Sequence, residues 1–305
     1  MQKDVVTVIV LNWNGKEDTV ECLCSLRLQK KVKIEIIVVD NGSTDDSIIA
    51  INEQFPQTVV IDNGENLGYS GGNNSGLKYA LALDREFVFI LNNDTVLDPL
   101  CIANLMQYLQ LHPEVAAVSP VAYYYNQPDL IYFAGGIINK KGIASHIGNC
   151  YLEELDNELA IESQWLSGCA IFTRKNVLKK VGFFENKFFL VFEDTDWSFR
   201  VLKAGYKLRV VLNASLLHKV STSFGTHFSP EYLYYYTRNH YLFIERNFPS
   251  RSWPRLFFFA TKEAYHKIMI HSSNIFDRNE LIKSTLLGFS DYILRRFGNR
   301  NYRWV

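Results

Sequence analysis

The sequence has few cysteines and no long hydrophobic run. Its five cysteines are an odd number and form no CxxC pair, which disfavours a disulfide framework or a zinc site and favours a reducing compartment. The apolar run near the first residue spans about seven positions, too few for a signal peptide or a membrane span, and no later uncharged run reaches about eighteen. We therefore expect a cytoplasmic protein.

The chain also has no net charge, because 32 Lys and Arg residues balance 32 Asp and Glu residues. This disfavours nucleic acid as a partner bound through bulk positive charge. The hydrophobic share of 48% excludes disorder for most of the chain, and 305 residues suffice for one large domain or two small ones. The charge is unevenly distributed, since residues 230–305 carry 12 basic and 6 acidic side chains.

Up to about residue 120, short apolar runs rich in β-branched residues alternate with helical patterns. We expect buried strands at 5–11, 34–40, 58–62 and 87–94. Helices are expected at about 14–28, after an N-cap at Ser43 or Thr44, and after a glycine-rich turn at 68–76. This alternation predicts an α/β fold with a mostly parallel, Rossmann-like sheet flanked by helices.

Beyond residue 120 the alternation ends. Loops and short hairpins precede a strand at 164–174, a helix at 193–206 that Gly205 closes, and a strand at 207–212. Residues 230–305 have helical patterns rich in Tyr, Phe and Arg. We expect one domain at 1–229, with halves at 1–120 and 121–229, and a helical C-terminal region at 230–305.

Polar residues follow two of the predicted strands at the point where each strand ends. Residues 40–45 have the sequence DNGSTD, and residues 92–94 have the sequence NND. Because ligands bind beyond the carboxyl ends of the strands in an open parallel sheet, both sets are candidate ligand-binding residues. Asp94 is a candidate ligand of a divalent cation, which often binds one or two carboxylates besides substrate phosphates. The alternative is that both sets are turns with helix caps.

A third candidate set is Glu193, Asp194 and Asp196, at the start of a predicted helix. One acid there would stabilise the helix dipole, but three within four residues repel one another, which suggests a nearby cation or proton chemistry. Asp196 can pair with Arg200 four residues later. His218 follows a strand pattern and is structural unless it shares a metal with Asp94.

Seven motifs, in this order, resemble family 2 glycosyltransferases of the GT-A fold, and within them the bacterial rhamnosyltransferase-like branch that builds surface polysaccharides. They are VIVLNWNG, VVDNGSTD, NLGYSGGNNSG, FILNND, WLSGC, FFEDTDWSFR and LLHKV. The resemblance covers about residues 5–225, and a weaker likeness continues into YYYTRNHYLF.

The resemblance implies an inverting transfer of a sugar, with rhamnose the best match, from a dTDP- or UDP-sugar to a hydroxyl of a saccharide or lipid-linked saccharide. It implies that Asp194, beside Glu193, is the catalytic base, and that Asp94 and His218 hold Mg²⁺ or Mn²⁺. The nucleotide-binding residues that it implies are Asn12, Asp40, Asn41, Gly42, Asp45, Gly71, Asn73 and Asn93. The sugar and acceptor pocket that it implies contains Trp165, Gly168 and Trp197.

Several alternatives stay open. The basic, aromatic region 230–305 could contact the cytoplasmic face of the inner membrane, pack on the catalytic domain, or form a homodimer. Asn92 stands where the family's metal motif has Asp, which fits a non-catalytic nucleotide-sugar-binding module, whereas Asp94 and Glu193–Asp194 favour an enzyme. A nucleotidyltransferase would have a glycine-rich, basic loop where this chain has NWNG, at 12–15.

Overall fold

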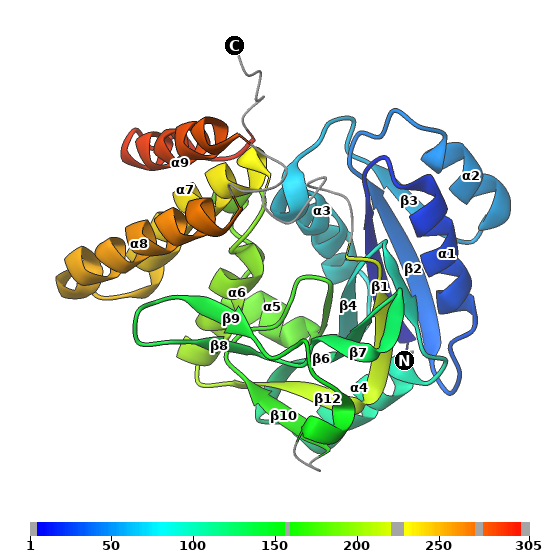
Figure 1. Cartoon of the computed structure of the whole chain (residues 1–305). Coiled ribbons are helices and arrows are strands. Elements are labelled where there is room, and N and C mark those ends of the chain that lie inside the picture. Colours follow the sequence, from blue (N-terminus) through cyan, green and yellow to red (C-terminus); the bar gives the residue numbers. More distant parts are fainter. Residues whose placement is uncertain (1–4, 156–158, 221–228, 272–276, 300–305) are drawn as a thin grey trace.

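A large mixed sheet forms the centre of the protein. The computed structural model describes residues 5–155, 159–220, 229–271 and 277–299. In this part of the chain the strand order is β10-β12-β6-β11-β4-β1-β2-β3, with β5 paired to β12 and β7 paired to β6. Helices pack along the sheet, and helices α7, α8 and α9 gather at one end of the molecule (Figure 1).

The first strands of the chain form a parallel half-sheet, as the sequence predicts. These strands are β1 (Val5–Asn12), β2 (Lys33–Asp40), β3 (Val59–Asp62) and β4 (Phe87–Asn92). The Val and Ile side chains of β1 and β4 are buried on both faces, which is why these runs are continuously apolar, whereas those of β3 are only partly buried. The register aligns Asn12 with Asp40, and Asn92 with Leu11, so the polar strand ends meet at one edge.

Three helices connect these strands: α1 (Lys16–Arg27), α2 (Ser47–Gln54) and α3 (Gly68–Ala82). The expected glycine-rich turn at 68–76 is wrong, because these residues form the first part of α3. A Cβ atom on Gly76 would stand 2.5 Å from Ile9 and 2.9 Å from Val39, so glycine lets α3 approach the sheet closely. The expected N-cap is also wrong: α2 begins at Ser47, whose backbone N–H donates to the Asp45 carboxylate.

The second half of the sheet is mixed. Strand β11 is antiparallel to both of its neighbours, β4 and β6, while β12 is parallel to β6. The expected strand at 164–174 is shorter than predicted, and the one at 207–212 extends to His218. The elements are β5 (Thr95–Leu97), α4 (Cys101–Leu111), β6 (Val115–Tyr124), β7 (Gln127–Phe133), β8 (Gly136–Ile138), β9 (Ala144–His146), β10 (Ala160–Ser163), β11 (Ala170–Arg174), α5 (Lys175–Val181), α6 (Glu193–Lys203) and β12 (Lys207–His218).

The C-terminal region is helical, as expected. It contains α7 (Pro230–Asn247), α8 (Trp253–His271) and α9 (Arg278–Ile293). The Ser229 hydroxyl caps α7 by accepting from the Tyr232 backbone N–H, and Pro230 occupies the first turn. Helix α7 is buried along most of its length against α6, α8 and α9. Within the described helices, none combines the length and apolarity that crossing a bilayer requires.

Candidate active site

A hydrogen-bond network joins the ends of β1 and β2. The Asn12 amide donates to Asp40 Oδ1 at 2.7 Å and to Ser43 Oγ at 3.1 Å, and the Ser43 backbone N–H donates to Asp40 Oδ2 at 2.8 Å. Asn12 and Asp40 are fully buried. The network fixes the loop that follows β2, in which Gly42 has a φ of +75° and Asp45 is exposed.

The next residue, Asn41, braces the start of α3. Its side-chain amide donates to Asn66 Oδ1 and to the Gly68 carbonyl, and its Oδ1 accepts from the Leu67 backbone N–H. Asn93 connects the end of β4 to α1, because its amide donates to Thr19 Oγ1 at 2.9 Å. The predicted nucleotide-binding residues thus shape one loop surface at the carboxyl edge of the sheet, and their contact with a nucleotide stays a prediction.

Asp94 and His218 form a buried pair. The antiparallel register of β5 and β12 aligns His218 with Thr95, which brings His218 Nε2 to 3.2 Å from Asp94 Oδ1. The two residues are 4% and 6% exposed. Within the described residues, no group of three or more His, Cys, Asp or Glu side chains is arranged to hold a metal ion. The protein therefore offers two donor groups here, a carboxylate and an imidazole.

Asp194 lies in the first turn of α6, where hydrogen bonds fix both of its oxygens. Its Oδ2 accepts from the Gly168 backbone N–H at 2.8 Å, and its Oδ1 accepts from the Thr195 backbone N–H at 2.6 Å. Burial raises the pKa of Asp194, and these hydrogen bonds oppose the rise. Burial also raises the pKa of Glu193 well above its ordinary value, and the charge of Asp194 raises it further. Glu193 is therefore the member of the pair that holds a proton more readily.

The two acidic sites lie around the same pair of side chains, Tyr132 and Cys169. The Tyr132 ring centroid is 4.9 Å from that of His218, and the Asn92 backbone N–H donates to the Cys169 carbonyl at 2.9 Å. Burial, together with the charges of Asp94 and Asp194, raises the pKa of the Cys169 thiol to about 12. The same causes raise the pKa of Tyr132. Asp194 accepts from the backbone N–H of the neighbouring Gly168, so both acidic sites border the same short stretch of backbone.

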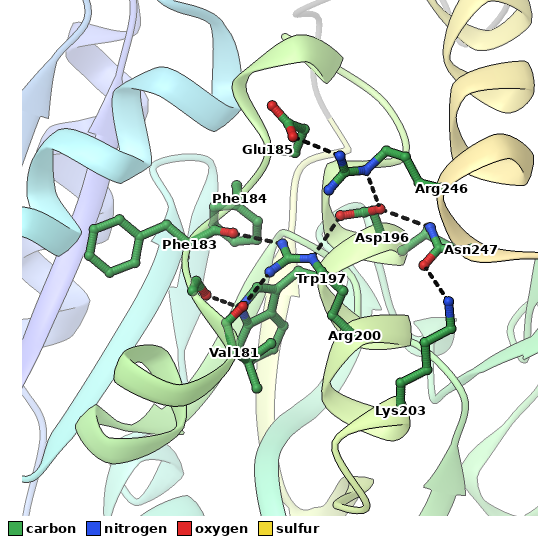
Figure 2. Close-up of polar contacts among 12 residues, drawn as sticks. Val181, Phe183, Phe184, Glu185, Asp196, Trp197, Arg200, Lys203, Arg246 and Asn247 are labelled. Carbon is green, nitrogen blue, oxygen red and sulfur yellow. Dashed lines mark hydrogen bonds and ion pairs between the residues drawn. The ribbon is translucent and has the colours of Figure 1, made fainter.

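Asp196, two residues after Asp194, connects α6 to α7. Its fully buried carboxylate accepts from Arg200 Nε at 2.9 Å, from Arg246 Nε at 3.0 Å and from Asn247 Nδ2 at 2.8 Å (Figure 2). The predicted pair of Asp196 and Arg200 is confirmed. Of the three neighbouring acids, Asp196 is thus a structural anchor, whereas the catalytic role of Glu193 and Asp194 stays a prediction.

The prediction that Trp197 lines the sugar and acceptor pocket is wrong. Its side chain is 1% exposed and its indole N–H donates to the Gly182 carbonyl, so it lies in the core behind α6 (Figure 2). Trp165 is partly exposed; its indole N–H donates to the Ser145 carbonyl, and its ring lies 5.3 Å from that of Phe133. Gly168 contacts Asp194 directly through its backbone.

Two predicted nucleotide-binding residues lie within α3. Asn73 is fully buried, and its amide donates to the Tyr69 carbonyl at 3.0 Å. A Cβ atom on Gly71 would stand 2.7 Å from the Leu67 side chain. In this structure Asn73 stabilises the first turns of α3, and Gly71 lets α3 pack closely against Leu67.

Three residues near the site have no distinguishing signal in the sequence. The Tyr69 hydroxyl donates to the Gly168 carbonyl at 2.5 Å, and Tyr132 stacks edge-on to His218. Lys219 Nζ lies 2.6 Å from both Asp18 and Glu21, and its backbone N–H donates to the Asp94 carbonyl. Their proximity depends on strand pairing, which no local pattern reveals.

The family profile described as glycosyl transferase family 2 matches residues 7–182. The chain belongs to this family. An N-acetylglucosaminyl-diphospho-decaprenol L-rhamnosyltransferase of Mycobacterium tuberculosis is 25% identical to this family 2 glycosyltransferase over 243 residues, 73% of this chain and 78% of the relative. A poly-beta-1,6-N-acetyl-D-glucosamine synthase of Staphylococcus aureus is 26% identical over 198 residues, 63% of this chain and 44% of the relative.

Solved structures of other glycosyltransferases have the same fold. The mannosyltransferase PcManGT from Pyrobaculum calidifontis, in complex with GDP-Man and Mn²⁺, matches with a TM-score of 0.59 and 17% identity, over 95% of this chain and 87% of that chain. GalNAc-T7 with UDP, GalNAc and Mn²⁺ matches with a TM-score of 0.61 and 14% identity, over 89% and 58%. This family 2 glycosyltransferase therefore has the GT-A fold, with a helical C-terminal extension.

Proposed function

We propose that the protein is an inverting, metal-dependent glycosyltransferase. It moves a sugar, with rhamnose the first candidate, from a nucleoside diphosphate to a hydroxyl of a saccharide or lipid-linked saccharide in surface polysaccharide synthesis. The observation that carries this proposal is that both acidic sites border one short stretch of backbone. Asp194 accepts from the Gly168 backbone N–H, and the Cys169 carbonyl accepts from Asn92, two residues before Asp94. The name of the Mycobacterium tuberculosis relative supports rhamnose as the sugar and a lipid-linked saccharide as the acceptor.

The Asp94–His218 pair fits a divalent cation. Adjacent ligands of an octahedral ion, each about 2.1 Å from the metal, lie roughly 3 Å apart. The two donor atoms here are 3.2 Å apart, and phosphate oxygens of the donor would complete the ligand set. When bound, Mg²⁺ or Mn²⁺ would neutralise the charge that develops on the diphosphate leaving group. Mn²⁺ in two structurally similar proteins supports this proposal.

Asp194 is the proposed general base, which takes the proton of the acceptor hydroxyl. The N–H groups of Gly168 and Thr195 hold its carboxylate in one orientation. Because burial raises its pKa, Asp194 is a stronger base than an exposed aspartate. Burial and the charge of Asp194 raise the pKa of Glu193 well above its ordinary value, which favours a proton on Glu193 over a second buried negative charge.

Release of the nucleoside diphosphate tests this proposal. The wild type, supplied with dTDP-rhamnose or a UDP-sugar, a saccharide acceptor and Mg²⁺ or Mn²⁺, should turn over only when the cation is present. Asp194→Asn should lose about 10²- to 10⁴-fold in kcat while binding the donor normally by calorimetry. Glu162→Gln, which changes a 75% exposed acid that pairs with Arg209, is the matched control.

Wild-type turnover in Asp194→Asn would remove the base assignment. Donor binding by the wild type without transfer or donor hydrolysis would favour the alternative, a non-catalytic nucleotide-sugar-binding module.

We also propose that α8 and α9 carry a lipid face, which contacts anionic lipid on the cytoplasmic side of the inner membrane. On α9, Ile282, Leu286, Phe289 and Ile293 recur every three or four residues and are 37–62% exposed. On α8, exposed Phe258 and Tyr265 alternate in a similar row with exposed Arg255 and Lys262, and exposed Arg251 lies just before the helix. Large apolar side chains between basic ones are typical of helices that lie on anionic membranes.

The two rows meet where Arg278 of α9 lies 3.1 Å from Met269 Sδ of α8. The net charge of +6 on residues 230–305 suits an anionic surface, which favours lipid over a second, equally basic copy of this face. Such contact would bring the site toward lipid-linked acceptors.

Sedimentation with vesicles tests the lipid face. The wild type should bind vesicles that contain phosphatidylglycerol and should bind pure phosphatidylcholine less. Leu286→Glu should lose most of this binding, whereas Ile49→Glu, a change at a 59% exposed site on α2, should keep it. Equal binding by both variants would refute the lipid face, and a dimer that only Leu286→Glu breaks would assign the face to self-association.

A further inference from the structure

The backbone directly before Glu193 and Asp194 has an uncommon conformation. Phe189, Val191 and Phe192 have φ angles of +60°, +67° and +76°. Residues other than glycine rarely adopt positive φ, and such a conformation persists only where its surroundings hold it. This left-handed segment, residues 189–192, sets the direction in which α6 starts and hence where Asp194 points.

Helix α7 holds the left-handed segment through Asn239. Its single side-chain amide donates to the carbonyls of Phe188 at 2.7 Å, Leu190 at 2.6 Å and Val191 at 2.9 Å. The neighbouring Arg238 donates to the carbonyls of Phe188 at 3.1 Å and Lys187 at 3.3 Å. Both side chains are fully buried, so water does not replace these contacts.

Aromatic contacts with α7 fix the side chains of the same segment. The Phe189 ring stacks on Tyr235 at 5.3 Å, and the Phe192 ring stacks on His240 at 5.0 Å. Four backbone carbonyls between residues 187 and 191, and two rings, are therefore oriented by α7.

The opposite side of the segment contacts α3. The Ser70 backbone N–H donates to the Phe189 carbonyl at 3.3 Å, and a Cβ atom on Gly68 would stand 2.5 Å from that oxygen. Asn74 of α3 donates to the Phe184 carbonyl a few residues earlier. The segment is thus held between α3, which borders the predicted nucleotide site, and α7.

We infer that Arg238 and Asn239 are positioning residues for the general base: they hold the left-handed segment and so fix the place of Asp194 against Gly168. The inference rests on the proposed function, in which Asp194 takes the proton of the acceptor. A displacement of the order of 1 Å at a catalytic group can cost about 10²-fold in rate. The two residues therefore act on turnover through Asp194, without touching the substrate.

The test compares Asn239→Ala with Glu245→Ala, a matched control on the same helix. Glu245 accepts from the Tyr292 hydroxyl at 2.7 Å and from Arg295 at 2.6 Å, away from the left-handed segment. We expect Asn239→Ala to lower kcat about 10- to 100-fold with an unchanged donor KM. We expect Glu245→Ala to keep kcat even if its melting temperature falls as much.

Two further measurements separate positioning from simple loss of stability. In Asn239→Ala the pH profile of kcat should shift to lower pH, because a loosened Asp194 becomes more hydrated and its burial no longer raises its pKa as far. Amide hydrogen exchange should increase in peptides covering 186–196 in Asn239→Ala and stay unchanged there in Glu245→Ala.

Equal losses of kcat in the two variants at equal melting temperature would overturn the inference, as would unchanged exchange in 186–196. If Asn239→Ala does not fold, Arg238→Lys replaces it, since lysine keeps the charge and loses most of the guanidinium donors. The exchange measurement does not depend on activity. Full turnover in Asp194→Asn would contradict the proposed base. Unchanged exchange in 186–196 would contradict the positioning role of Arg238 and Asn239, so the two failures are distinguishable.

Discussion

Replacing Asp196 with Ala measures how strongly α7 is anchored to α6. The fully buried carboxylate accepts hydrogen bonds from two guanidinium groups and one amide (Figure 2). Removing one partner of a buried ion pair costs about 3–5 kcal/mol, because the opposite charge stays behind without compensation. Here Arg200 and Arg246 are 22% and 28% exposed and can be partly hydrated, so we expect the lower end, about 3 kcal/mol.

In a chain of this size, about 3 kcal/mol corresponds to a fall of roughly 5 °C in Tm. Urea unfolding with an unchanged m-value should give the same loss in the free energy of unfolding. Glu162→Ala is the control: its side chain is 75% exposed and lies 3.0 Å from Arg209, and such surface pairs contribute below about 1 kcal/mol. A loss in Asp196→Ala no larger than in the control would refute the reasoning.

Three smaller changes probe the site. Glu193→Gln should raise Tm at pH 7.5 and lose this advantage near pH 4. Burial holds the folded-state pKa of Glu193 above its unfolded value, so the wild type loses stability as pH rises. A constant difference in Tm across pH would contradict this reasoning. Gly42→Ala should cost at least about 1–3 kcal/mol in urea unfolding, since φ is +75° and a Cβ would stand 2.6 Å from the Glu65 backbone; a neutral effect would contradict the strain. His218→Gln should weaken Mn²⁺ binding in the presence of UDP by about tenfold or more in calorimetry, and unchanged affinity would remove His218 from the metal site.

The first half of the fold follows from local pattern. Buried parallel strands need continuous β-branched runs, and their carboxyl ends meet at one edge, so the positions of Asp40 and Asn92 at that edge were predictable. The sequence predicts a role in the site for His218 only on the condition that it shares a metal with Asp94. The contact between the two side chains depends on the register of β5 with β12. Strand β5 is three residues long, which is too short for an alternation of apolar and polar residues to be recognised.

The errors have a common cause, which is that tertiary packing overrides local preference. Glycines at 68–76 favour a turn, yet they form a helix because only small residues let α3 approach Ile9 and Val39. Trp197 shares a helix with Asp194, but α5 and its following loop cover its face. The motif YYYTRNHYLF contains Arg238 and Asn239, which contact the left-handed segment. This role could not be predicted, because no sequence pattern indicates the conformation of that segment.

The predicted boundary at residue 229 can be tested by truncation, and α7 gives reason to expect that the shorter chain does not fold alone. Phe188 and Phe192 are at most 5% exposed in a cluster completed by α7 residues such as Phe243. Without α7, these rings would lose their α7 partners, and the Asp196 carboxylate would lose Arg246 and Asn247 and keep only Arg200. The left-handed segment would also lose its hydrogen bonds to Arg238 and Asn239. A chain of residues 1–229 should therefore unfold without cooperativity and be cleaved readily by protease near 186–196. Cooperative unfolding near the wild-type Tm would instead establish 1–229 as an independent domain.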